Sequence, residues 1–172
     1  MKKGLTLIEL MISTMMVVIL AGVVIYVLRA ILLSWSGSEA RAGINITLNR
    51  AVEEMRRDML KAKAIASGTN AEVRFTAINN TNWIYYLYNS NDSYPPSFNQ
   101  QKYELRKAGL SGALTNGAFI YSNGATILTD VLPPPTTDLS FSNNLVTLDL
   151  SSVHDDETVR LRTQIKPRNS GL

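Results

Sequence analysis

Two groups of ionisable residues in this sequence are candidates for a functional site. The first contains Glu9. This carboxylate stands at the head of a segment from Leu10 to Leu28 that contains no charged residue. Burying it in lipid without a partner would cost several kcal/mol, so we expect Glu9 to meet a cation or to lie where water reaches it. The chemistry open to Glu9 is therefore contact with a polar or charged partner, or solvation at a membrane surface.

The second group surrounds His154, which is the only histidine and is followed by Asp155, Asp156 and Glu157. One imidazole supplies neither a multi-histidine metal site nor a catalytic triad without partners that the sequence cannot place. The three carboxylates are calcium candidates by ligand type, although their spacing is not that of an EF-hand loop. We expect His154 to lie in a solvated turn, and we predict no catalytic residue, metal or cofactor, and hence no enzyme.

A row of aromatic residues raises the possibility of nucleic-acid binding. Trp83, Tyr85, Tyr86 and Tyr88 could stack on bases or could pack in a core. In a strand, Trp83 and Tyr85 would lie on one face and Tyr86 and Tyr88 on the other. The sequence has 17 basic and 14 acidic residues, an excess too small for strong long-range attraction to DNA. Core packing is the favoured interpretation, and nucleic acid is not an expected partner.

The segment that positions Glu9 has the length of a membrane-spanning helix. Leu10 to Leu28 comprises 19 residues, and at about 1.5 Å per residue these would cover roughly 28 Å, close to the hydrocarbon thickness of a bilayer. Lys2 and Lys3 precede it, so the positive-inside tendency keeps the N-terminus cytoplasmic and sends the remaining chain out of the cytoplasm. The sequence predicts a single-pass membrane protein that contacts lipid.

The N-terminus resembles the processing signal of type IV pilins and of the pseudopilins of type II secretion. The matching features are a short leader with Lys2 and Lys3 that ends in Gly4, and an apolar stretch that starts at Leu5 and has Glu9 in fifth place. The resemblance implies that a prepilin peptidase cuts between Gly4 and Leu5 and that Leu5 is N-methylated. It also implies that Glu9 pairs with the new N-terminus of a neighbouring subunit and so directs assembly of a periplasmic or cell-surface filament on an inner-membrane platform.

Within this family the chain is most similar to the minor subunits. Residues 48–63 resemble the start of the soluble helix of J-type minor pseudopilins, and residues 159–169 resemble their last strand. Leu5 replaces the Phe with which many major pilins begin, the first proline is Pro95, and no cysteine is present to close a C-terminal disulfide loop. These departures favour a minor pseudopilin or minor pilin. A DNA-binding minor pilin for DNA uptake and an uncleaved receptor or adhesin remain as alternatives.

Hydrophobic periodicity predicts the elements beyond the membrane segment. Apolar residues spaced by four and three positions predict one buried stripe of a helix that stops near Ser67 and Gly68, with the charged residues between them on a solvated face. That stripe consists of Leu48, Val52, Met55, Met59 and Ala62. After this helix the period changes to two. The expected strands are residues 72–77, 83–88, 102–106, 119–121, 126–129, 139–141, 145–150 and 159–165, with Asn143 and Asn144 as a hairpin turn.

These elements predict an α+β protein in which a long N-terminal helix packs on an antiparallel sheet. The expected organisation is a leader at 1–4, a membrane and assembly helix at 5–33, the soluble half of the same helix at 34–66 and a β-rich domain outside the cytoplasm at 67–172. The pilin resemblance implies the same arrangement.

Overall fold

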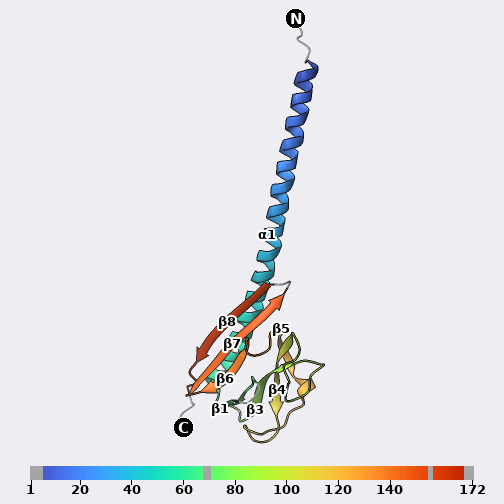
Figure 1. The fold of residues 1–172 in the computed structure, drawn as a ribbon. Coiled ribbons are helices and arrows are strands. Elements are labelled where there is room, and N and C mark those ends of the chain that lie inside the picture. Colours follow the sequence, from blue (N-terminus) through green and yellow to red (C-terminus); the bar gives the residue numbers. More distant parts are fainter. Residues whose placement is uncertain (1–5, 68–70, 155–156, 169–172) are drawn as a thin grey trace. The chain divides into compact units, whose positions relative to one another are not determined.

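A computed structural model describes residues 6–67, 71–154 and 157–168. The chain divides into two compact units, Met1–Glu39 and Ala40–Leu172, and the helix α1 (Leu7–Lys61) belongs to both (Figure 1). The second unit combines the end of α1 with an antiparallel sheet. The predicted α+β fold is therefore confirmed.

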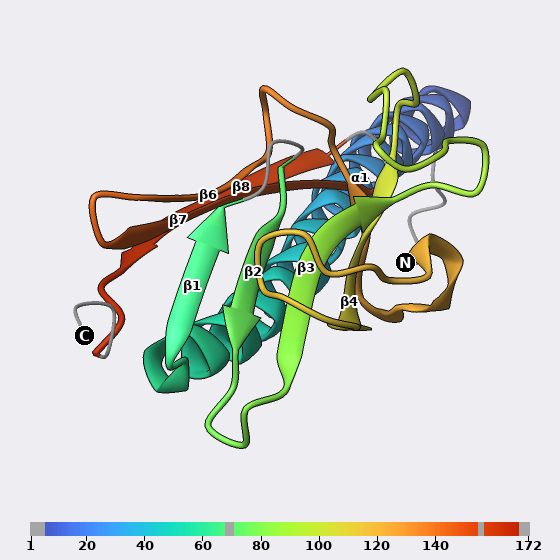
Figure 2. The same ribbon diagram turned by 90° about the horizontal axis from the view of Figure 1, so that it is seen from below.

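Within the second unit, α1 buries the predicted stripe. Leu48, Met55 and Met59 have no exposed surface, and Val52 and Ala62 are also buried. Figure 2 shows this part of the helix lying against one face of the sheet. The alternating spacing of four and three keeps the first four of these residues on the side of the helix that the sheet covers, and Ala62 follows directly after the last helical residue.

The C-terminal end of α1 differs from the sequence prediction. The helix ends at Lys61, and residues Ala64–Ser67 form the strand β1 instead of a last helical turn. The backbone N–H of Lys63 donates to the carbonyl of Thr76 at 2.8 Å, and Ile65 packs against the core. The backbone N–H and C=O groups of this segment thus form hydrogen bonds with the next strand instead of the hydrogen bonds of a longer helix. The expected stop at Gly68 lies outside the described residues.

The described strands form an eight-stranded antiparallel sheet in the order β1-β2-β3-β4-β5-β7-β6, with β8 paired to β7. After β1 the strands are β2 (Val73–Thr76), β3 (Asn82–Tyr88), β4 (Tyr103–Leu110), β5 (Ala125–Val131), β6 (Asp138–Ser142), β7 (Leu145–His154) and β8 (Glu157–Ile165). Asn143 and Asn144 link β6 to β7 with φ values of 51° and 60°, as the hairpin prediction requires.

One predicted strand is wrong. Residues 119–121 do not form a strand, because Tyr121–Asn123 is a short 3-10 helix and Ala118 makes only an isolated bridge to Ser111. Phe119 and Tyr121 instead pack their rings against Tyr86, at centroid distances of 4.8 and 5.5 Å. Phe119 and Tyr121 are apolar because they cover a face of the sheet, and they do not add a strand to it.

The sheet is therefore buried on both faces near β3. Tyr85 and Leu87 belong to the main core beneath α1, whereas Ile84 and Tyr86 form a smaller core with Ala108 on the opposite face. The alternation predicted for the aromatic row is confirmed. Tyr85 and Tyr86 are fully buried, so these two rings serve core packing rather than an open stacking surface.

A buried ion pair between Glu72 and Arg74 lies on the same second face. Arg74 donates to Glu72 at 2.9 Å and to the Tyr94 hydroxyl at 2.9 Å, and its guanidinium also reaches the carbonyls of Thr115 and Gly117. Burial opposes the charge on Arg74, but Glu72 outweighs this effect and the pKa of Arg74 is raised. Loop residues distant in sequence cover these charges, which period-two patterning cannot reveal.

Candidate membrane and assembly site

The first turn of α1 is closed by reciprocal hydrogen bonds between Thr6 and Glu9. The Glu9 Oε2 atom accepts from the Thr6 backbone N–H at 3.0 Å and from the Thr6 hydroxyl at 2.9 Å. The Glu9 N–H in turn donates to the Thr6 hydroxyl oxygen at 3.3 Å. This is a capping box, in which two side chains satisfy N–H groups that the start of a helix leaves unpaired.

The capping box gives Glu9 polar contacts within its own chain. An apolar environment penalises an unsatisfied N–H or carboxylate by several kcal/mol, so local bonds make the start of the helix compatible with lipid. Sequence reasoning identified Glu9 but missed Thr6. The available signal was a Thr three residues before a Glu at the head of an apolar run.

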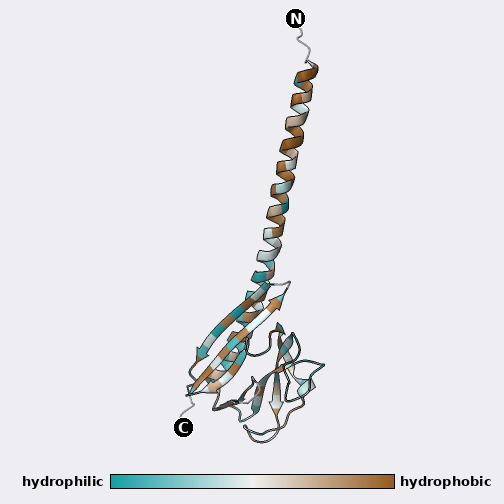
Figure 3. Cartoon of the chain, in the orientation of Figure 1, coloured by the Kyte–Doolittle hydropathy of each residue, from teal (hydrophilic) through white to brown (hydrophobic). Residues whose placement is uncertain are grey.

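After this turn, α1 presents an apolar surface that the first unit leaves open on all sides. The large apolar side chains from Leu7 to Trp35 are exposed, from 47% for Val27 to 78% for Leu7. Figure 3 shows the corresponding hydrophobic colour along the N-terminal part of the helix. Such a surface is unfavourable in water and needs lipid or other apolar helices around it.

The hydroxyl groups of this helix are bonded to its own backbone. Thr14 donates to the carbonyls of Leu10 and Met11 at 3.1 and 2.9 Å, and Ser38 donates to the carbonyl of Ser34 at 3.0 Å. Bonds of this type satisfy hydroxyls without water. They allow Thr14 to lie within a segment that is long and apolar enough to cross a membrane.

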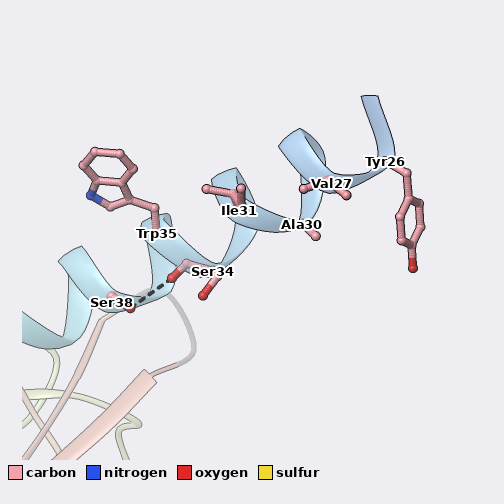
Figure 4. Close-up of a pocket in the computed structure, with 7 residues that line it drawn as sticks. All are labelled: Tyr26, Val27, Ala30, Ile31, Ser34, Trp35 and Ser38. Atoms are coloured by element: carbon pink, nitrogen blue, oxygen red, sulfur yellow. Dashed lines mark hydrogen bonds between the residues drawn. The ribbon is translucent and has the colours of Figure 1, made fainter. Parts of the chain in front are cut away.

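A shallow depression runs along α1 where the apolar segment ends (Figure 4). Its lining consists of Tyr26, Val27, Ala30, Ile31, Ser34, Trp35 and Ser38. It contains no charged group, and a single helix supplies all of its walls. It is therefore open helix surface rather than an enclosed ligand site.

The structure brings together only part of the sequence-predicted site. Lys2, Lys3, Gly4 and Leu5 lie outside the described residues, so the expected processing site has no described geometry. Glu9 is placed in the first helical turn, as expected from the position of the apolar run.

Of the three calcium candidates, the structure describes only Glu157. Asp155 and Asp156 lie outside the described residues, whereas Glu157 begins β8 and accepts two hydrogen bonds from Arg41, at 2.7 and 3.0 Å. His154 ends β7 opposite Glu157 and is exposed. Over residues 6–67, 71–154 and 157–168, no three side chains of the metal-binding types gather into a ligand set.

The predicted solvated face of α1 is confirmed at Arg50, Glu53, Arg56, Arg57 and Lys61, which are exposed, but Asp58 is an exception. Its Oδ2 atom accepts from the Tyr85 hydroxyl at 2.7 Å and from the Lys107 ammonium at 2.5 Å. Burial, with the nearby Asp58 carboxylate, raises the pKa of the Tyr85 hydroxyl. Asp58 thus joins the helix to β3 and β4 instead of facing solvent.

Comparison with known proteins matched no family model, no curated protein and no solved structure. The functional proposal therefore rests on the physical features of the chain. It has a helix near the N-terminus that is long and apolar enough to cross a membrane, and none of that helix's apolar window is buried within the described chain.

Proposed function

We propose that this protein is a minor pseudopilin or minor pilin, a non-enzymatic subunit that assembles through its N-terminal helix in a type II secretion or type IV pilus system. The observation that carries the proposal is a carboxylate held at the start of an otherwise uncovered apolar helix. A simple anchor needs the apolar surface but not Glu9. The pilin-like leader at Lys2 to Gly4 supplies a reason for the carboxylate.

In this role the subunit waits in the inner membrane with its second unit outside the cytoplasm. A prepilin peptidase removes residues 1–4, and the new ammonium group at Leu5 becomes available to Glu9 of a neighbouring subunit. An ion pair in an apolar bundle fixes the register of packing, because breaking it leaves an unpaired buried charge at a cost of about 3–5 kcal/mol. The inner-membrane assembly platform and other pilin-like subunits are the partners of this step.

The test is the mass of the native N-terminus. We expect the protein purified from its own cells to begin at N-methylated Leu5 and the Gly4→Val variant to retain its first four residues, because a branched side chain at the cleavage position blocks the peptidase. Intact-mass spectrometry measures both. A wild-type protein that keeps Met1 to Gly4 would contradict processing and favour an uncleaved receptor or adhesin.

A further inference from the structure

The strand β8 lies at an edge of the sheet. Among the strands that the structure describes, only β7 pairs with β8, and it does so along the whole of Glu157–Ile165. The other two strands with a single partner are shorter, and β1 and β6 lie close to each other. An edge strand presents unpaired N–H and C=O groups that another extended chain can bind.

The hydrogen-bond pattern shows which residues of β8 present those groups. The Ser151 carbonyl accepts from the Leu132 N–H at 2.9 Å, so the backbone of Ser151 points away from β8. Ser151 lies opposite Arg160, and backbone direction alternates along an antiparallel ladder. The residues of β8 whose backbone groups point to the open edge are therefore Thr158, Arg160, Arg162 and Gln164.

The side chains of these same residues form the exposed row of β8. Thr158, Arg160, Arg162 and Gln164 are all exposed, whereas Val159 and Leu161 pack against the core. The two arginine side chains are 55% and 65% exposed. One extended partner could thus meet backbone donors, backbone acceptors and cations along a single line.

Charge along this row limits what the partner can be. Asp149 on β7 accepts two bonds from Arg160, both at 2.7 Å, and lies 3.8 Å from Arg162. Lys166 and Arg168 follow β8 and are exposed. After Arg160 pairs with Asp149, the edge retains the charges of Arg162, Lys166 and Arg168.

A second copy of the same edge is a poor occupant. Antiparallel pairing of two β8 strands about Leu161 would place Arg160 opposite Arg162 of the other copy, and like charges directly opposite each other destabilise a strand pair. An acidic strand instead pairs with the exposed side chains of Arg162, Lys166 and Arg168, of which only Arg162 has a carboxylate within ion-pair distance among the described residues, at 3.8 Å. Nucleic acid would use the cations but would leave most of the open N–H and C=O groups of β8 without a partner.

We infer that the open edge of β8 binds an extended acidic segment of another protein by strand addition, with Arg162 as the specificity-determining cation. The backbone groups of Thr158, Arg160, Arg162 and Gln164 form the ladder, and alternate carboxylates of the partner lie over the arginine row. This inference goes beyond the proposed filament role and does not depend on it.

The test uses the full chain in non-ionic detergent and a synthetic peptide as long as β8, in which glutamate alternates with threonine and valine. We expect the peptide to bind and to slow amide hydrogen exchange at Thr158, Arg160, Arg162 and Gln164. Fluorescence anisotropy of the labelled peptide measures affinity, and exchange resolved to single amides locates the contact.

Matched variants separate the two components of recognition. Arg162→Gln should weaken binding about twofold to fivefold, the effect typical of one exposed charge pair. Gln164→Pro removes an N–H that points to the open edge and spares the bonds to β7, so it should weaken binding while the fold is kept. A peptide with lysine in place of glutamate, and an acidic peptide with N-methylated backbone, should both bind poorly.

Several results would overturn the inference. Equal binding of the acidic and lysine peptides would exclude charge recognition, and equal binding of the N-methylated peptide would exclude strand addition. Exchange protection elsewhere in the chain would place the contact at another surface. Binding of a single-stranded oligonucleotide in preference to the acidic peptide would assign the edge to nucleic acid instead.

Discussion

Asp149, on the face of the sheet opposite α1, depends mainly on Arg160 and more weakly on Arg162. Only 6% of its side chain is exposed, yet Arg160 bonds both of its carboxylate oxygens at 2.7 Å. The hydrogen bonds from Arg160 lower the pKa of Asp149, and they outweigh the opposing effect of burial. The charged form of Asp149 therefore stabilises the folded state.

The sign of the pH dependence is set by that lowered pKa. Since the unfolded value is near 3.9, the stabilisation is present above that pH and is lost as the pH falls through the folded-state value. We expect Arg160→Gln to lower the free energy of unfolding modestly near neutral pH, because Arg160 is largely exposed to solvent and solvent weakens its pairing with Asp149. The difference from wild type should vanish in strong acid.

Urea unfolding of the full chain in non-ionic detergent, repeated from neutral to strongly acidic pH, measures this effect. The exposed Arg168 provides the control, because Arg168→Gln removes the same charge away from Asp149. A stability difference for Arg160→Gln that is the same at every pH would contradict the assignment.

At the scale of elements, the contact between α1 and the sheet depends on the stripe from Leu48 to Ala62. Met55 is fully buried in it, whereas Ile46 on the same helix is 69% exposed. Met55→Ala should lower the free energy of unfolding by about 2–5 kcal/mol, because it leaves a cavity between helix and sheet. Ile46→Ala should change it by less than about 0.5 kcal/mol. Thermal unfolding measures both, and similar losses would show that the stripe is not the core of the contact.

That stripe was predictable because the spacing of its apolar residues by four and three is a local feature of the sequence. The same reasoning placed most strands, the Asn143–Asn144 turn and the two faces of the aromatic row. The end of α1 was not predictable, because the residues that draw β1 into the sheet lie beyond the helix, at Val73 to Thr76. Local helix propensity was overruled by a tertiary pairing.

Other failures share this cause. Period-two patterning did not reveal that Glu72 and Arg74 are buried, because the residues that cover them, Tyr94 and the Thr115–Gly117 loop, are distant in sequence. Phe119 and Tyr121 are residue types common in strands, but here their rings pack over Tyr86 and cover that face of the sheet. At the candidate site, Glu9 was identified from its conflict with an apolar run, whereas Thr6 was assigned no role, although its spacing of three residues from Glu9 is the sequence signature of a capping box.

At the scale of the whole molecule, the proposed role requires Glu9 to do more than cap a helix. Glutamine also completes a capping box, so Glu9→Gln keeps the bonding pattern with Thr6 and removes the charge. We expect both Glu9→Ala and Glu9→Gln to be folded and processed but to be absent from filaments, because neither can form the ion pair with a neighbouring N-terminus.

Quantitative immunoblotting of sheared filaments against the membrane fraction measures this recruitment. Thr6→Val is the matched control, since it disrupts the cap and keeps the carboxylate. Normal recruitment of Glu9→Gln would show that capping alone explains Glu9 and would refute the assembly role.

The continuity of α1 has a mechanical consequence. The helix α1 supplies the segment that is long and apolar enough to cross a membrane, and it also supplies one layer of the second unit's core. Within the second unit, a force that pulls on α1 acts on its contact with the sheet, where the buried side chains from Leu48 to Met59 together resist extraction of the helix. The exposed ion pair between Arg41 and Glu157 adds little to this resistance, because solvent-exposed pairs stabilise weakly.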